Sequence, residues 1–337
     1  MKRIGKRTVR LEGSVHIGGF AAAVGPKEAE GPLAEYFDVR AEDEFLGEDS
    51  FEKAESRLQQ LAVKTALKKG GVVESQVDLI FAGDLLNQCI GSAYGLKDFG
   101  IPFVGLYGAC STMALGLIMA ATAVESGAAE RAVAVTSSHF CSSERQFRFP
   151  LEYGGQRPPT AQWTVTGSGA VVLDNEPASD GISVQAYTVD KIVDLNVTDM
   201  NNMGAAMAPA AADTIAVFLQ DTATAPSDYD LIVTGDLGFT GSELLLKLLS
   251  EQGIELENHK DCGKMIFDRF RQDVHSGGSG CGCSASVLCS CLLQKLASGK
   301  LKNILFCATG ALMSPTASMQ GESIPSIAHL VHLKSEN

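Results

Sequence analysis

Asp-Leu-Ile-Phe-Ala-Gly-Asp-Leu at residues 78–85 decides the fold, because the chain repeats it as Asp-Leu-Ile-Val-Thr-Gly-Asp-Leu at residues 230–237. A second pair of stretches follows in the same order: a turn of small residues leads into an apolar run at residues 108–127 and again at residues 280–299. The second copy holds about twenty more residues between its landmarks. Chance is the alternative explanation for the eight-residue match alone, but it does not account for two matches in register. The period is too long for a solenoid, so we predict a duplicated half-fold with a ligand cleft along the seam.

Composition indicates a folded chain of about two domains or one large duplicated one. The 337 residues are 45% hydrophobic and 20% charged, which is enough apolar material for a sizeable core. The net charge of −13 argues against nucleic-acid binding, and anionic lipid should repel such a chain unless a partner or a local patch intervenes. We see no signal peptide, and the most apolar run, residues 109–124, is short for a membrane span. We expect that run to be a buried helix.

The nine cysteines indicate reduced thiols in a reducing compartment, because small secreted disulfide scaffolds have a different pattern. Four of them cluster at positions 281, 283, 289 and 291 in contexts that look buried. A zinc site is the alternative for this cluster, but its spacing is not that of a finger or a ribbon. We therefore predict no metal site and no cofactor.

Strand and helix patterns alternate along both halves, which we place at residues 1–178 and 179–337, and this predicts an α/β fold with helices covering a sheet. In the first half we expect strands at 13–25, 78–82, 101–107, 131–137 and 168–174, and helices at 51–69 and 112–125. In the second half we expect strands at 182–189, 229–235, 303–308 and 326–333, and helices at 205–219, 241–251 and 284–297. The strands at 168–174 and 182–189 should be successive antiparallel strands. Residues 26–50 should form an exposed loop, and residues 138–163 an ordered functional loop.

Two strand-to-helix junctions are candidates for chemistry. Cys110 would lie at the start of a buried helix, where backbone N–H groups and the helix dipole lower a thiol pKa or bind an anion. The alternative is a small buried cysteine in a tight turn. The matching junction, His275 to Ser284, is glycine-rich, and Gly278 and Ser279 there could form a nest of N–H groups for an anion. The alternative is a tight loop between packed halves. His275 is the best ligand candidate among the six histidines.

Charged side chains supply further candidates. Asp84 and Asp236 follow the two repeated strands, and strand carboxyl ends face ligand crevices in α/β sheets. A turn or N-cap role is the alternative for each aspartate. Gln88 lies just beyond the first of them. An arginine-rich stretch could bind a carboxylate, with surface ion pairing as the alternative; its members are Arg145, Arg148 and Arg157.

These features resemble the thiolase superfamily over nearly the whole chain, and ketoacyl synthase III-type members in particular. The resemblance implies two pseudo-twofold halves in a layered α-β-α-β-α arrangement. A tighter resemblance, to the sporulation proteins of this superfamily, rests on the residues that open the chain and on three further stretches, at 108–114, 137–153 and 275–284.

The sporulation resemblance implies binding of dipicolinic acid, alone or as its calcium chelate. It also implies uptake of this molecule into the developing spore together with membrane proteins encoded alongside. We expect a cytoplasmic-type soluble chain that associates with the forespore membrane through those partners. Thiolase-like proteins are often dimeric, and the segment Phe99–Leu106 is the candidate interface element of a homodimer.

The catalytic pattern of the superfamily is incomplete here. Cys110 matches the family's nucleophile, but the histidine expected in Thr234–Gly238 is absent, and so is the asparagine or histidine expected near Gly280–Gly282. A general base and an oxyanion donor are thus missing, and each usually matters by orders of magnitude. We therefore expect a non-catalytic ligand-binding protein. Its candidate ligand-binding residues are Cys110, His275, Asp84, Gln88, Arg145, Arg148, Gly278 and Ser279. The alternatives are an active acyltransferase or condensing enzyme acting through Cys110, and a purely structural subunit of a membrane complex.

Overall fold

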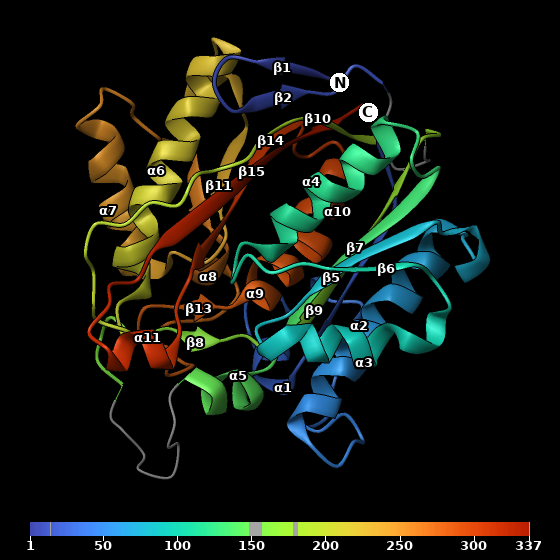
Figure 1. Cartoon of the computed structure of the whole chain (residues 1–337), viewed down its shortest axis with the longest axis horizontal. Coiled ribbons are helices and arrows are strands. Elements are labelled where there is room, and N and C mark those ends of the chain that lie inside the picture. Colours follow the sequence, from blue (N-terminus) through green and yellow to red (C-terminus); the bar gives the residue numbers. More distant parts are fainter. Residues whose placement is uncertain (14, 148–156, 178–180, 337) are drawn as a thin grey trace.

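The computed structural model describes residues 1–13, 15–147, 157–177 and 181–336. In this part of the chain, two five-stranded arrays with the same strand order meet in one large sheet (Figure 1). The first array runs β6-β5-β7-β9-β3, with bounds Phe103–Gly105, Leu79–Gly83, Arg131–Ser138, Gly167–Asp174 and His16–Val24. The second runs β12-β11-β14-β15-β10, with bounds His259–Asp261, Leu231–Thr234, Asn303–Ala311, Ser326–Ser335 and Ile182–Thr188. The repeated stretches thus form equivalent strands, β5 and β11.

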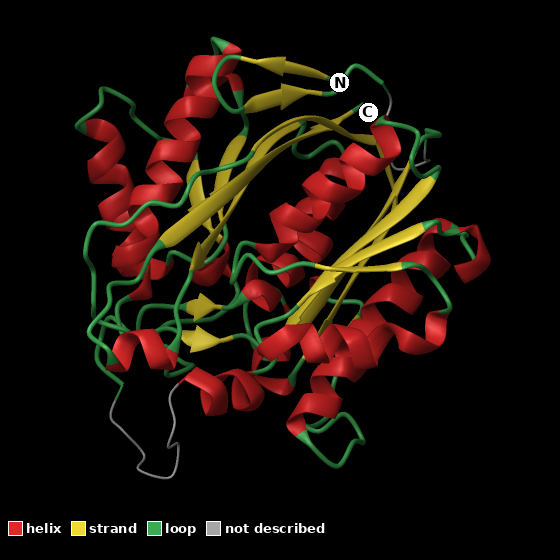
Figure 2. Ribbon diagram, in the orientation of Figure 1, coloured by secondary structure: helices red, strands yellow, loops and turns green. Residues whose placement is uncertain are grey.

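One layer of helices lies between the two arrays, and further helices cover their outer faces (Figure 2). The middle layer holds α4 (Thr112–Glu125), which packs on strands of both arrays, and the helix pair α9 (Cys281–Val287) and α10 (Leu293–Ala297). The outer layer of the first array is α2 (Phe51–Gly70), with α3 (Ile90–Leu96) beside it. The outer layer of the second is α6 (Met203–Thr222), with α7 (Gly238–Ser250) beside it. This confirms the predicted α-β-α-β-α arrangement.

The remaining strands and α-helices are short. They are β1 (Lys2–Ile4), β2 (Thr8–Arg10), α1 (Pro26–Ala29), β4 (Val39–Arg40), α5 (Phe140–Phe147), β8 (Trp163–Thr164), α8 (Cys262–Met265), β13 (Gly278–Ser279) and α11 (Pro315–Met319). Of these, α1 and β4 lie in the segment predicted as an exposed loop, and Glu28 on α1 is fully buried. The prediction of an exposed loop is therefore wrong for that part of the segment.

Local chemistry explains the helix boundaries that the sequence predicts well. Ser50 caps α2, because its side chain accepts from the backbone N–H of Lys53 at 3.3 Å, and Gly71 ends the helix with φ of 65°. α4 has the predicted bounds and is mostly buried. α6 begins at Met203, earlier than expected, because the Asn202 side chain caps it by accepting from the backbone N–H of Ala205, the third residue of the helix. Pro209 consequently lies in the interior of α6 and not in its first turn.

One strand pairing is wrong in the prediction. β9 and β10 both run antiparallel to β3, which lies between them, so they are not an antiparallel pair. A single residue pair, Ser183 and His16, joins β10 to β3 and so links the two arrays. The predicted boundary between residues 178 and 179 falls in the connection from β9 to β10, partly outside the described residues, and it stays a prediction.

α6 is the single helix in the described part of the chain that is long and apolar enough, by length and composition alone, to cross a membrane. It packs on β14 and β15, and most of it is buried. Its apolar character therefore has an explanation in the core of the second half.

Candidate functional site

The seam between the halves brings the backbone of β14 against the turn that carries Cys110. A Cβ atom added to Gly310 would lie 2.5 Å from the carbonyl oxygen of Gly108 and 3.1 Å from the nitrogen of Ser111. Only a glycine permits this approach, because real Cβ contacts are essentially never so short. The second half thus forms part of the surroundings of the first half's cysteine, as a ligand site at the seam requires.

A hydrogen-bonded turn fixes Cys110 immediately before α4. Ala109 has φ of 48°, a conformation that non-glycine residues seldom adopt. The Thr112 hydroxyl donates to the Ala109 carbonyl at 2.6 Å and accepts from the Gly108 N–H at 3.1 Å. The Ser111 hydroxyl donates to the Gly108 carbonyl at 2.6 Å. Backbone strain of this kind costs about 1–3 kcal/mol and clusters at functional sites.

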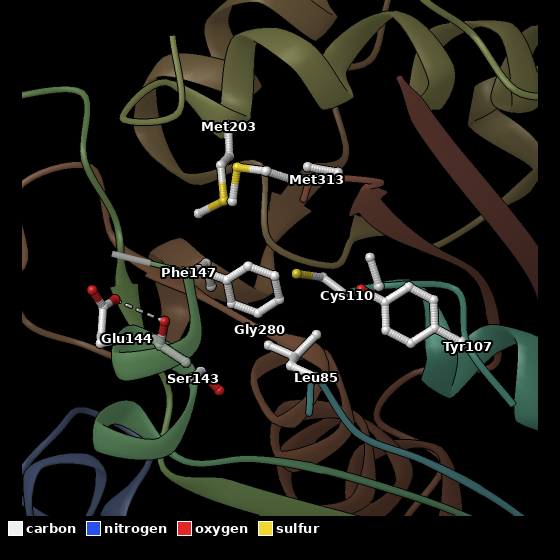
Figure 3. A pocket seen from close by; sticks show the side chains of 13 residues that line it. Leu85, Tyr107, Cys110, Ser143, Glu144, Phe147, Met203, Gly280 and Met313 are labelled. Atoms are coloured by element: carbon white, nitrogen blue, oxygen red, sulfur yellow. Dashed lines mark hydrogen bonds between the residues drawn. The ribbon is translucent and has the colours of Figure 1, made fainter. Parts of the chain in front are cut away.

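Cys110 faces a small inner cavity of about 40 Å³. That is room for about three water molecules. Figure 3 shows the Cys110 sulfur pointing toward the ring of Phe147, with Met203 and Met313 together on one side. The lining residues are Leu85, Tyr107, Ala109, Cys110, Ser143, Glu144, Phe147, Thr164, Met203, Ser279, Gly280, Ala311 and Met313. They come from both halves and are mostly apolar.

Asp236 sets the electrostatics beside the thiol. Burial raises the pKa of Cys110 well above its ordinary value, and the neighbouring Asp236 carboxyl raises it further. Burial also raises the pKa of Asp236 to about 7, although hydrogen bonds from the Thr309 hydroxyl (2.8 Å) and the Gly280 N–H (2.9 Å) oppose the shift. The thiol therefore stays protonated at neutral pH. The Gly280 N–H, a candidate donor for a ligand anion, is already used by the protein's own carboxyl.

A larger outer hollow of about 510 Å³ adjoins the inner cavity and shares Tyr107, Phe147 and Met313 with it. Its other lining residues are Leu86, Asn87, Gln88, Cys89, Gln146, Ser314, Pro315 and Thr316. The volume is in the range of small-molecule sites, about 300–1,000 Å³. Amide and hydroxyl side chains dominate its polar lining, and Gln88 contributes to this hollow rather than to the inner cavity.

The structure brings only part of the predicted set together. Cys110 and Ser279 line the inner cavity, and Gly278 precedes Ser279 in β13. Asp84 lines neither cavity, because its carboxyl accepts from the backbone N–H of Leu86 (2.9 Å) and from Ser92, through both N–H (2.7 Å) and hydroxyl (2.6 Å). The expectation that Asp84 faces a ligand is therefore wrong. Its carboxyl instead stabilises the turn that follows β5, which was the alternative role.

His275 and the arginines do not converge on Cys110 either. The His275 ring donates from Nδ1 to the Pro158 carbonyl (2.8 Å), and its Nε2 lies 3.0 Å from Asp273 in a separate surface hollow. Arg145 is half-exposed and pairs with Glu52 at 2.9 Å, as surface ion pairing predicts. Arg157 pairs with Asp273 at 2.7 Å. Arg148 lies outside the described residues.

Sequence reasoning missed the most consequential neighbour of Cys110. Asp236 was singled out as a strand-end aspartate but not included among the site residues. The available signal was that Asp236 holds the same place in the second repeated stretch as Asp84 holds in the first. The apolar lining residues Met203, Phe147 and Met313 have no such signal, because their role depends only on packing. The clustered cysteines are buried free thiols, and the described residues contain no group of three or more His, Cys, Asp or Glu side chains placed to hold a metal ion.

Comparisons with known proteins assign the chain to a family. The family described as stage V sporulation protein AD (SpoVAD) matches residues 5–334. Stage V sporulation protein AD of Bacillus subtilis (strain 168) is 46% identical over 330 residues, which are 98% of this chain and 97% of the relative.

Among solved structures, similar folds include 3-oxoacyl-[acyl-carrier-protein] synthase III from Aquifex aeolicus VF5, with a TM-score of 0.55 and 13% identity over 95% of this chain and 99% of that one. Another is a single-residue variant of OleA from Xanthomonas campestris, with a TM-score of 0.61 and 14% identity over 99% of this chain and 100% of that one. At such identities these two structures bear on the fold alone.

Proposed function

The chain belongs to the stage V sporulation protein AD family and has a role in sporulation, and from this premise we propose that it binds dipicolinic acid. The ligand is the free pyridine-2,6-dicarboxylate or its calcium chelate, and binding supports its uptake into the developing spore. The observation that carries this proposal is the outer hollow, which opens beside a family cysteine whose thiol is kept protonated.

The two cavities suggest how a planar aromatic diacid would be held. The inner cavity is too small for it, whereas the outer hollow is large enough. Tyr107 and Phe147 offer aromatic surface for the ring where the two spaces meet, and Asn87 and Gln88 offer amide donors for a carboxylate. The ligand would therefore lie mainly in the outer hollow, with one end toward Cys110.

Charge favours the calcium chelate over the free dianion in this arrangement. Neither cavity has a lysine or arginine among its described lining residues. A dianion would have to leave water without a cationic partner there, which is costly. Calcium bound to the ligand neutralises that charge. The protein itself then needs no calcium-binding loop.

We further propose that the protein is not an enzyme. A Cys110 thiol hydrogen-bonded beside a buried carboxyl is the reverse of an activated thiolate, which needs a cationic or imidazole neighbour. No histidine is among the described residues that line the inner cavity. An acyl-transfer role through Cys110 is the competing hypothesis. An acyl-coenzyme A labelling assay separates the two, since a burst of acyl-enzyme at Cys110 would favour catalysis.

Calorimetry tests the ligand. We expect calcium dipicolinate to bind the intact chain with micromolar or weaker affinity, an order-of-magnitude expectation, because the carboxylates must lose hydration.

Filling the hollow with Met313→Trp should weaken binding at least about tenfold. Met319→Trp is the matched control, because Met319 is 82% exposed and lines neither cavity. Benzene-1,3-dicarboxylate, which lacks the chelating ring nitrogen, should bind more weakly in the presence of calcium. Absence of heat with either form of dipicolinate would refute the proposal and favour a purely structural subunit.

We also propose a homodimer built on β6. This strand pairs with β5 on one side and ends the sheet, so its other edge presents unpaired backbone groups. Phe103 on this strand is 42% exposed, and Tyr94 and Tyr107 are exposed nearby in the chain.

Phe103→Lys should shift the protein from dimer to monomer in light scattering, since an edge lysine opposes strand pairing. Phe45→Lys, with the same exposure but in a turn before α2 and not on the sheet edge, should leave the mass unchanged. A monomeric parent protein would contradict this proposal.

Membrane proteins of the same sporulation complex are the proposed partners. Contact with them would place the chain peripherally at the forespore membrane. This proposal rests on family membership alone.

A further inference from the structure

Residues 262–280 have no counterpart of similar length in the first half. They join β12 to α9, whereas residues 106–111 join the equivalent elements β6 and α4. The longer connection contains α8, an irregular turn and β13. Because the first half makes the same array and middle helix without it, the half-fold does not require this segment. Most of the additional length of the second copy lies here.

The turn in this segment holds an aromatic ring out in solvent. Phe270 is 97% exposed, more than any other large hydrophobic residue in the described chain. The turn is nevertheless well ordered by hydrogen bonds. Asp268 Oδ1 accepts from the N–H groups of Phe270 (2.9 Å) and Arg271 (3.3 Å), and the Gln272 side chain ties the turn to α1 by donating to the Lys27 carbonyl at 2.6 Å. The backbone on either side of Phe270 is therefore held in place, and the ring adds apolar surface that the fold does not bury.

Two exposed arginines adjoin Phe270 in the sequence, and further cations lie in neighbouring parts of the structure. Arg269 and Arg271 flank it in the sequence, and the Arg271 side chain is 87% exposed. Arg269 and Lys264 both lie over the ring of Phe239, at 4.3 and 5.2 Å. Arg157 and Lys27 lie beside Asp273. We call this set the 264–273 patch; its cations are Lys27, Arg157, Lys264, Arg269 and Arg271, and its acids are Glu30, Glu44, Asp268 and Asp273, with Glu28 buried beside Lys27 and its pKa raised to about 8. The patch is thus net positive in a chain of net charge −13.

The form of the patch favours a lipid surface over a protein groove. Protein interfaces bury about 800 Å² per partner around clustered anchors that fill pockets. Here one aromatic ring projects from a turn, with arginines on both sides. A bilayer interface accepts such an arrangement, because the ring enters the headgroup region while the arginines meet phosphates. The exposed Arg269 and Arg271 supply a local attraction to anionic headgroups that the acidic remainder of the chain lacks.

We propose that the 264–273 patch docks the protein directly on an anionic bilayer, with Phe270 entering the interface and Arg269 and Arg271 contacting lipid phosphates. One aromatic ring and a few cations give weak, salt-sensitive binding, which a membrane-protein partner would reinforce. The contact is independent of dipicolinate, so its failure and the failure of the proposed ligand function are distinguishable.

Vesicle flotation with the full chain tests this inference. We expect the protein to float with vesicles of equal parts phosphatidylglycerol and phosphatidylcholine, to remain behind with pure phosphatidylcholine, and to be released by about 0.5 M salt. Each arginine should contribute about fivefold to partitioning, so R269Q with R271Q should lower it about 25-fold. F270A should lower it about tenfold.

Matched controls keep the result interpretable. M319A removes another highly exposed apolar side chain, and K68Q with K97Q removes two exposed cations elsewhere; both should float like the parent protein. F270W should show a blue-shifted emission on adding anionic vesicles. Flotation that F270A does not change, or no flotation of the parent protein, would overturn the proposal. The protein could instead bind soluble polyglutamate as strongly as it binds vesicles, in a way that depends on the two arginines but not on Phe270. That result would also overturn the proposal and would favour an acidic protein partner.

Discussion

Asp236→Asn should raise the alkylation rate of Cys110 by iodoacetamide roughly a hundredfold at pH 8, because removing a neighbouring like charge lowers a pKa by about 1–3 units. The carboxyl beside the thiol has a pKa of about 7, so it is ionised under these conditions and opposes formation of a second negative charge. Because the thiolate is the reactive form, the alkylation rate follows that change. Mass mapping of each cysteine against time gives the rates.

The sign of the pH dependence checks the same idea. As the pH rises through about 7, Asp236 loses its proton and makes ionisation of Cys110 harder, so the parent protein should show little gain in Cys110 reactivity between about pH 6 and 8.5. The Asn variant should gain steeply over that range. Cys89 and Cys141, which are only partly buried, serve as internal references in each digest. Glu52→Gln, an acid-to-amide change at a half-exposed site, is the control variant. Rapid alkylation of Cys110 in the parent protein would contradict the assignment of a protonated thiol.

Gly310→Ala should destabilise the protein by about 3 kcal/mol, the upper end of the usual cost of overpacking. The new Cβ would lie 2.5 Å from the Gly108 carbonyl oxygen and 3.3 Å from the nitrogen of Cys110. Both are backbone atoms of a tightly bonded turn, so they cannot move aside without disrupting it. Chemical denaturation monitored by circular dichroism measures the change in the free energy of unfolding.

Gly116→Ala is the control for this prediction. Gly116 lies in α4, and a Cβ there would meet its nearest neighbour, Ala134 Cβ, at an ordinary 3.4 Å. Alanine is also favoured over glycine within a helix by up to about 1 kcal/mol. The variant should therefore be neutral or slightly stabilised. Equal stability of the two alanine variants would show that the backbone at Gly310 does not pack as closely against the Cys110 turn as the structure indicates.

The repeat in the sequence predicted a duplicated half-fold, whereas the layered arrangement of helices and sheets was implied by the resemblance to the thiolase superfamily. Residues 78–85 and 230–237 indeed surround β5 and β11, which occupy the same place in the two arrays. Helix bounds were predictable where a cap or a composition change marked them, as at Ser50 and Thr112. The pairing of β9 with β10 was not, because a short connection between strands does not reveal that β3 lies between them.

The site was less predictable, because it depends on which polar groups the protein uses for itself. The glycine-rich loop does meet Cys110, but its Gly280 N–H is bound by Asp236, which lies 44 residues earlier in the chain. Arg145 looked available for a ligand in the sequence, yet Glu52, far away in the chain, pairs with it. The outer hollow forms where residues 86–89, 146–147 and 313–316 come together in the fold. No local sequence pattern predicts that these segments lie side by side.

A crystal structure of the intact chain grown with calcium dipicolinate tests the central claim most directly. We predict one ligand in the hollow between Gln88 and Met313, with its ring against Tyr107 and Phe147, and with the Cys110 sulfur unmodified. A ligand bound elsewhere on the molecule would contradict this account of the site, and so would a covalent acyl group on Cys110 after exposure to a thioester.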